Sequence, residues 1–221
     1  MEMKIIYIKI NQIKVQCVIY NMKKLLLLTL TIAFIHRSYS QRNFNDSISY
    51  SRNMLTKNAM LVLGGWSVAN IASGFIVAGQ TTGEAKYFWK MNAYWNFINL
   101  GLAGLAYFNT VRSMNKHYSF SENNKAQRGM EKLYVFNAGL DLVYIVGGFY
   151  LRERGLKETD QKKMDQFRGY GSSIILQGGF LLVMDCVMYV LHHKNTMKMD
   201  NKLQKVEITG GLGSVGLVYR F

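Results

Sequence analysis

Residues 170–191 read YGSSIILQGGFLLVMDCVMYVL, an apolar run of 22 residues whose only charged side chain is Asp185. An α-helix rises about 1.5 Å per residue, so about 20 residues are needed to cross the hydrocarbon core of a bilayer. A helix of a water-soluble protein shows only an apolar stripe to its core. This run therefore predicts a transmembrane helix.

Three further runs have the same character, and each is long enough to span a bilayer. The four runs are 58–79, 91–111, 133–151 and 170–191. The connections between them are short and polar, so consecutive runs are expected to pack antiparallel. The predicted fold is an all-α membrane protein, a four-transmembrane-helix bundle of two antiparallel hairpins. A soluble bundle of unusually apolar helices is the alternative.

The composition agrees with a membrane protein that has basic connections. Hydrophobic residues make up 49% of the chain and charged residues 18%, and the formal net charge is +14. The charges lie between the apolar runs, which is typical of a multi-span chain. No basic cluster alternates with stacking aromatic residues, as a nucleic-acid groove would require. We therefore expect the lipid bilayer, and not nucleic acid, as the partner.

The N-terminal region has the layout of a cleavable signal peptide at 22–40. Lys23 and Lys24 precede an apolar stretch that is too short to span, and small residues precede a cut after Ser40. Residues 1–21 are then an upstream extension, and 41–57 form a polar N-terminal segment. A first membrane anchor at 22–40 is the alternative reading.

Signal-directed export would deliver the chain to a bacterial inner membrane with its mature N-terminus outside. The distribution of Lys and Arg between the connections favours the opposite orientation, because the side assigned to the exterior carries more of them. We favour the orientation that the signal peptide gives.

Polar residues recur within the runs at spacings of three and four, which place them on one helix face. Such groups are costly in hydrocarbon unless they are paired, so they mark either helix contacts or a site. The candidate polar core consists of Asn70, Asn92, Asn96, Asn99, Asn137, Asp141, Tyr144, Gln177 and Asp185. Small residues, among them Gly65, Gly104, Gly148 and Gly178, predict close helix contacts as well.

No motif in the chain indicates catalysis, a cofactor or a metal site. A phosphate-binding glycine loop, a nucleophile elbow and a zinc-protease helix are all missing from the sequence. The two cysteines, Cys17 and Cys186, cannot form a disulfide framework. Asp185 and His192 share a helix face but fall short of a metal ligand set. We therefore expect a protein that is not an enzyme.

The tail 194–221 is polar and ends differently from the rest of the chain. Apolar and other residues alternate on either side of the glycine-rich stretch 210–213. Alternation around a glycine-rich turn is typical of a β-hairpin. We expect a short hairpin-like tail that lies outside the membrane domain 58–193.

Several short motifs resemble an uncharacterised family of small bacterial four-span membrane proteins, a domain of unknown function. They are Gly64-Gly65-Trp66, Trp95-Asn96, Asn137-Ala138-Gly139-Leu140-Asp141, Gly169-Tyr170-Gly171, Gln177-Gly178 and Asp185. The resemblance covers roughly residues 53–193. It implies the four-span fold and no particular activity.

The sequence is compatible with two functional hypotheses. The first is a non-enzymatic structural or accessory subunit of the cell envelope, which associates with itself or with a larger membrane complex. The second is a small transport or permeation module that uses the intramembrane acids Asp141 and Asp185 on a polar path.

Overall fold

The computed structural model describes residues 24, 44–204, 206–211 and 214–219. The upstream extension 1–21 and, except for Lys24, the signal peptide 22–40 lie outside the described residues. The chain divides into two compact units, Met1–Asn45 and Asp46–Phe221. The helix bundle described below belongs to the second unit.

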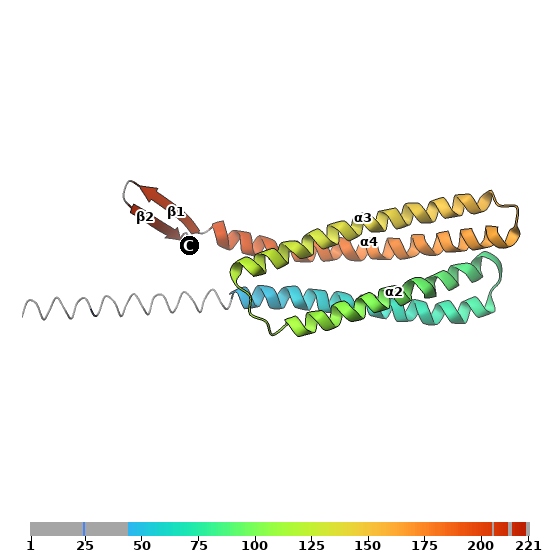
Figure 1. The fold of residues 1–221 in the computed structure, drawn as a ribbon, viewed down its shortest axis with the longest axis horizontal. Helices are drawn as coiled ribbons and strands as arrows, with labels where there is room; N and C mark the ends of the chain where they lie inside the picture. Colours follow the sequence, from blue (N-terminus) through green and yellow to red (C-terminus); the bar gives the residue numbers. More distant parts are fainter. Residues whose placement is uncertain (1–23, 25–43, 205, 212–213, 220–221) are drawn as a thin grey trace, which may run out of the picture. The chain divides into compact units, whose positions relative to one another are not determined.

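Four long helices make up most of the described chain (Figure 1). The first is called here the N-terminal helix, and it is followed by α2, α3 and α4. Connections of two, six and four residues join them. The bounds are Phe44–Gln80 for the N-terminal helix, Gly83–Ser113 for α2, Phe120–Leu156 for α3 and Gln161–Gln204 for α4.

Three of these helices are long and apolar enough to cross a membrane: Phe44–Gln80, Phe120–Leu156 and the Gln161–Lys202 part of α4. Helix α2 is not among them, and Asn92, Asn96 and Asn99 interrupt its apolar run. Length and apolarity by themselves thus support three spans where the sequence analysis predicts four.

The helices are longer than the apolar runs within them. Helix α3 begins at Phe120, well before its run at 133–151, because a capping box fixes its first turn. The Ser119 hydroxyl accepts from the Glu122 amide at 3.3 Å, and the Glu122 carboxylate accepts from the Ser119 amide at 2.9 Å. The apolar pattern marks the part of a helix suited to lipid, whereas the cap marks where the helix begins.

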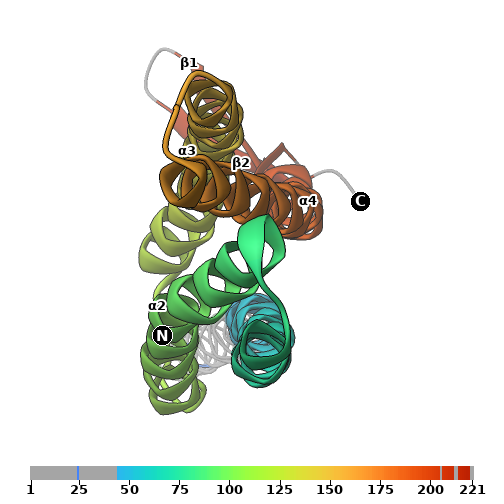
Figure 2. The same cartoon turned by 90° about the vertical axis from the view of Figure 1, so that its right-hand side faces the viewer.

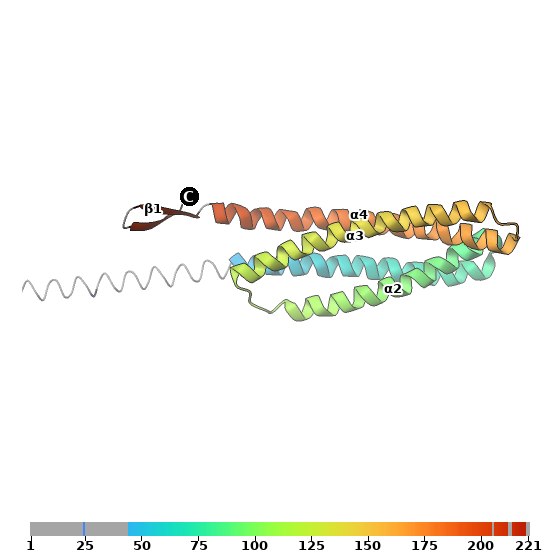
Figure 3. The ribbon, with the colours of Figure 1, turned by 45° about the horizontal axis from the view of Figure 1, so that its top comes forward.

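The four helices run alongside one another (Figure 3). Helix α4 packs along α3 and also on α2, whereas no close backbone approach joins the described helices α2 and α3. Figure 2 shows the bundle viewed along its helices. The bundle is therefore less closed on the side between α2 and α3.

Glycines bring α3 and α4 together at one crossing. A Cβ on Gly148 would lie 2.7 Å from the Gly171 carbonyl oxygen, and one on Gly171 would lie 2.5 Å from the Gly148 carbonyl oxygen. Gly178 also faces α3, as predicted. Gly65 and Gly104 have nothing within 4 Å of a Cβ position, so the prediction of close contacts there is wrong. Helical spacing identifies a row of small residues but not the side that a neighbouring helix covers.

Polar side chains fill the interior of the bundle, and apolar side chains cover its outside. The largest fully buried side chains are Met199, His192, Gln127, Gln177, Asn92, Asn96, Asn123, Thr196, Ser67 and Ser173. Large exposed side chains include Ile76, Ile98, Leu105, Phe108, Phe136, Val143, Val146 and Val183. In water the hydrophobic effect favours the reverse arrangement. The arrangement suits helices surrounded by lipid.

The chain after α4 contains two short strands, β1 (Val206–Gly211) and β2 (Ser214–Tyr219). They pair antiparallel, with Val206 opposite Tyr219 and Gly211 opposite Ser214. The strands fall within the stretch for which a short hairpin is expected.

Candidate functional site

A network of side-chain hydrogen bonds joins three helices. The Gln177 carboxamide of α4 is its centre: its oxygen accepts from Trp66 Nε1 at 2.9 Å. Its nitrogen donates to Asn70 Oδ1 at 3.2 Å and to Asn92 Oδ1 at 2.8 Å. The Ser173 hydroxyl also donates to Asn92 Oδ1, at 2.8 Å. We call Trp66, Asn70, Asn92, Ser173 and Gln177 the amide network.

The asparagines of α2 continue this network along the helix. Asn96 donates to the Asn92 backbone carbonyl at 2.8 Å, and Asn99 donates to Asn96 Oδ1 at 3.4 Å. Beside the network, the Trp66 ring stacks on Phe180 with a centroid distance of 4.0 Å. Hydrogen bonds that replace lost water contacts hold helices together in a membrane. The network is suited to fixing how α2, α4 and the N-terminal helix pack.

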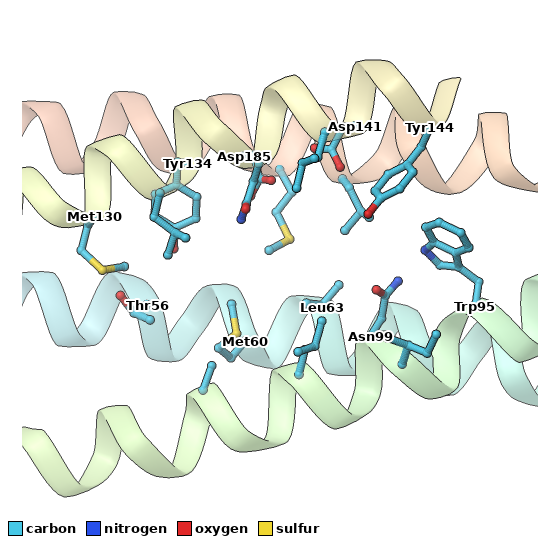
Figure 4. Close-up of a pocket in the computed structure, with 18 residues that line it drawn as sticks. Thr56, Met60, Leu63, Trp95, Asn99, Met130, Tyr134, Asp141, Tyr144 and Asp185 are labelled. Carbon is cyan, nitrogen blue, oxygen red and sulfur yellow. The ribbon is translucent and has the colours of Figure 1, made fainter. Parts of the chain in front are cut away.

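A pocket of about 510 Å³ lies further along the bundle, where α2 and α3 are apart (Figure 4). All four helices contribute to its walls. We call it the acid groove, because two aspartates belong to its lining. Its polar and aromatic lining residues are Thr56, Trp95, Asn99, Tyr134, Asn137, Asp141, Tyr144 and Asp185.

The two acids of the groove are deeply buried. Asp141 is 3% exposed and Asp185 is 5% exposed. Their carboxyl groups lie on the inner side of α3 and α4 (Figure 4), and they interact with each other. Asp141 Oδ2 has no hydrogen-bond partner among the described residues. Among the described residues that line the groove, none is basic, so the acids meet no cation there.

Two aromatic rings close the groove at the end nearer the amide network. Trp95 of α2 and Tyr144 of α3 are perpendicular, with ring centroids 5.0 Å apart. They lie together at one end of the groove in Figure 4. This contact joins α2 to α3 by side chains alone. Edge-to-face pairs of this kind are favourable by about 1 kcal/mol.

A third buried polar cluster was missed by the sequence analysis. Gln127 Nε2 donates to the His192 carbonyl oxygen at 2.7 Å, and His192 stacks on Tyr134. Arg52, which is buried, donates to Asn123. Gln127, His192, Arg52 and Asn123 lie outside the predicted spans. Polar residues are common there, so their residue types did not single them out. The spacing of four between Asn123 and Gln127 is a signal that could have found them.

The structure divides the nine predicted polar-core residues into two groups. Asn70, Asn92, Asn96, Asn99 and Gln177 belong to the amide network and its continuation along α2. Asn137, Asp141, Tyr144 and Asp185 line the acid groove, and Asn99 reaches it as well. The faces predicted to converge on one polar core thus serve two adjacent regions.

No set of three or more His, Cys, Asp or Glu side chains in the described part of the chain could hold a metal ion. The groove offers two carboxyls, aromatic rings and amides. This combination suits an ionic or aromatic contact with a ligand more than it suits a nucleophile and its base, which would have to lie within hydrogen-bond reach of each other.

Comparison with known proteins gives one match. A family model described as Family of unknown function (DUF6992) matches residues 62–186, more than half of the chain. The matched region contains the amide network and most of the acid groove. No curated protein and no solved structure matches.

Proposed function

Because the chain belongs to this family of unknown function, we propose its role from the bundle itself: it is a non-enzymatic integral membrane protein, a structural or accessory subunit of the cell envelope. In this proposal its helices cross a bacterial inner membrane four times after signal-directed export. The observation that carries the proposal is the inside-out distribution of side chains, polar within and apolar without.

The fourth span in this proposal is α2, which is not among the three helices with a stretch apolar enough to span. Its asparagines face inward, and Asn92 and Asn96 are fully buried. Its outward side chains are apolar, and they include Phe97, Ile98, Leu102, Leu105 and Phe108. A helix is insertion-competent in a bundle when its polar groups are satisfied by neighbours and its lipid-facing side is apolar. For insertion of α2 into the membrane, the apolarity of its lipid-facing side is therefore more important than the apolarity averaged over the whole helix.

The accessory role is supported by what the buried polar groups do. In the amide network they bond to one another across helices, which fixes the packing. Polar groups that are committed to interhelical bonds are not available to a substrate. A subunit of this kind contributes shape and an apolar outer surface to a larger assembly or to a second copy of itself.

A topology measurement tests the four-span arrangement. Single cysteines would replace the exposed residues Thr82, Asn115 and Thr159 in a background with Cys17→Ser and Cys186→Ser. Four spans place Thr82 and Thr159 on one side of the membrane and Asn115 on the other. Labelling of intact cells and of lysed cells with an impermeant maleimide distinguishes the sides. Labelling of Thr82→Cys and Asn115→Cys from the same side would contradict the proposal.

A transport or permeation module is the second candidate, and the shared lining of the acid groove favours it. Asp141 and Asp185 come from different helices and meet in one pocket. Intramembrane acids of this kind often lie on proton or cation paths. Proton and cation flux would be measured in vesicles that contain wild type, Asp141→Asn or Asp185→Asn. Equal leak in all three would exclude the path, whereas a selective loss of flux in folded variants would exclude a purely structural role.

A further inference from the structure

The acid groove has the dimensions and the position of a ligand site. Its volume of about 510 Å³ falls within the range of about 300–1,000 Å³ that is usual for small-molecule pockets. Its walls are α2 and α3, and the N-terminal helix and α4 complete it. Lining residues of both α2 and α3, among them Ile98 and Leu133, are exposed, so the groove opens to the outside between these two helices.

The rim of this opening is apolar and faces outward. Ile98 is 66% exposed and Leu102 is 57% exposed on the α2 side. Leu133 and Leu140 are exposed on the α3 side, and all four line the groove. In a membrane bundle these side chains meet lipid. A ligand that enters here has to pass through hydrocarbon, so it has to carry substantial apolar surface.

The interior of the groove selects for positive charge. Asp141 and Asp185 lie side by side, and Asp141 Oδ2 lacks a hydrogen-bond partner among the described residues. No basic side chain belongs to the described lining. A buried carboxylate is costly unless a cation offsets it. The groove therefore offers carboxyl oxygens that no basic side chain of the described lining offsets.

Aromatic rings flank the acids on both sides along the groove. Trp95 and Tyr144 lie at one end and Tyr134 toward the other (Figure 4). The face of an aromatic ring attracts a cation, more strongly where water is excluded. Weakly hydrated organic cations lose less hydration free energy than a metal ion when they enter such a place.

We propose that the acid groove binds a lipophilic organic cation, such as a quaternary ammonium or phosphonium compound, that enters from the membrane between α2 and α3. Its charge lies against Asp141 and Asp185, and its apolar groups contact Trp95, Tyr144 and the leucine rim. The proposal goes beyond the accessory role, because it assigns a ligand class to a part of the bundle that the amide network does not use.

Binding of tetraphenylphosphonium to the full-length protein in detergent tests the proposal. Equilibrium dialysis with radiolabelled cation is expected to show saturable binding with one site per chain. The Asp141→Asn/Asp185→Asn variant is expected to lose affinity by about tenfold or more, since it removes the negative charge while it keeps the side-chain shapes. Asp160→Asn is the matched control: Asp160 is exposed and caps α4, asparagine caps equally well, and affinity should not change.

A neutral compound of the same shape separates charge recognition from apolar binding. Tetraphenylmethane is expected not to displace the phosphonium from wild-type protein. Displacement at similar concentration would overturn the proposal and assign the groove to a lipid acyl chain or another apolar occupant. No saturable binding by wild type, or full affinity in a folded double variant, would overturn it too. If the double variant does not fold, the neutral competitor decides on wild type alone.

This test is independent of the tests of function. Binding to solubilised protein requires no flux and no knowledge of the orientation. If the cation binds but no flux is measured, the protein is a binding protein and not a transporter. If four spans are found but the cation does not bind, the accessory role stands and the ligand proposal fails.

Discussion

The amide network and the acid groove lie next to each other in one bundle and differ in their polar groups: the network joins three helices by side-chain hydrogen bonds, whereas the groove holds two carboxyl groups in a pocket between four helices. In the network, Gln177 alone bonds to Trp66, Asn70 and Asn92. In the groove, the Asp141 carboxyl retains an oxygen without a hydrogen-bond partner. Asn92 Nδ2 of the network also lacks a partner among the described residues. What distinguishes the groove is that its unpartnered atom is a carboxyl oxygen that lines a pocket. The difference separates the part of the bundle that holds the helices from the part available to a ligand.

The two regions also differ in which helices meet. Helices α3 and α4 stay close at the groove as well, where a Cβ on Gly178 would lie 3.1 Å from the Asp141 carbonyl oxygen. Near the network, Gly74 of the N-terminal helix lies against the backbone of Trp89 and Ala93, and Gly148 lies against Gly171. Along the groove, α2 and α3 meet through the Trp95–Tyr144 ring contact. Close backbone contact leaves no room for a ligand, whereas side-chain contact between splayed helices does.

The largest expected effect comes from filling the α3–α4 crossing. Gly171→Ala places a Cβ 2.5 Å from the Gly148 carbonyl oxygen, and backbone atoms cannot rotate away. The free energy of unfolding in detergent should fall by about 3 kcal/mol. Gly179→Ala on the same helix is the matched control, because nothing lies within 4 Å of its Cβ position. Equal effects of the two changes would show that the crossing is not close-packed.

Removing the centre of the amide network should have the next largest effect. Gln177→Met keeps a similar shape but deletes three hydrogen bonds to buried partners. We expect a loss of about 2 kcal/mol of unfolding free energy, from bonds that average about 0.6 kcal/mol in membranes. Unfolding by denaturing detergent measures it. The exposed Gln161→Met provides the control, and a similar loss there would mean that the network adds no stability.

A smaller effect is expected where the two regions meet. Asn99 lines the groove and donates to Asn96 through one long bond of 3.4 Å. Asn99→Leu should therefore cost about 0.5 kcal/mol or less. Thermal unfolding of both variants in detergent compares the loss of stability in Asn99→Leu with that in Gln177→Met. A loss as large as that of Gln177→Met would place Asn99 in the network rather than at its edge.

The smallest effect on stability is expected in the groove itself. Asp141→Asn is nearly isosteric, and Asp141 Oδ2 has no hydrogen-bond partner to lose. The unfolding free energy should not fall, because the change removes a buried carboxylate that no described lining residue offsets, while cation binding falls. The same unfolding measurement, made beside the dialysis, shows both. A strongly destabilised Asp141→Asn protein would mean that the carboxylate holds the helices together, which would erase the contrast with the network.

Much of the fold follows from hydrophobic runs, and its limits have physical causes. The four runs each lie within one helix of the bundle. The helix ends do not follow from the runs, because they depend on caps such as Ser119 and on contacts outside the membrane. The asparagine face of α2 was recognisable from its spacing, but the same asparagines interrupt the apolar run of this helix, which is not among the three candidate spans.

For the site, the nine predicted residues are all buried or line the groove, yet their grouping could not be predicted. Spacing places Asn137, Asp141 and Tyr144 on one face of α3, but it does not say which helix that face meets. Gln177 and Asp185 lie on the same helix two turns apart and serve different regions. Their roles depend on how far the neighbouring helices lie from α4 at the position of each residue along its axis.

By itself, the sequence determined that the chain is helical, that its helices are apolar over bilayer-length stretches and that polar side chains recur on one face of each. Periodicity and hydropathy are local properties, so one chain is enough to reveal them. Only the tertiary structure decided that α2 and α3 stay apart, that Gln177 is the centre of a network and that Asp141 and Asp185 share a pocket. Those facts depend on distances between segments far apart in the chain, which are set by packing rather than by spacing.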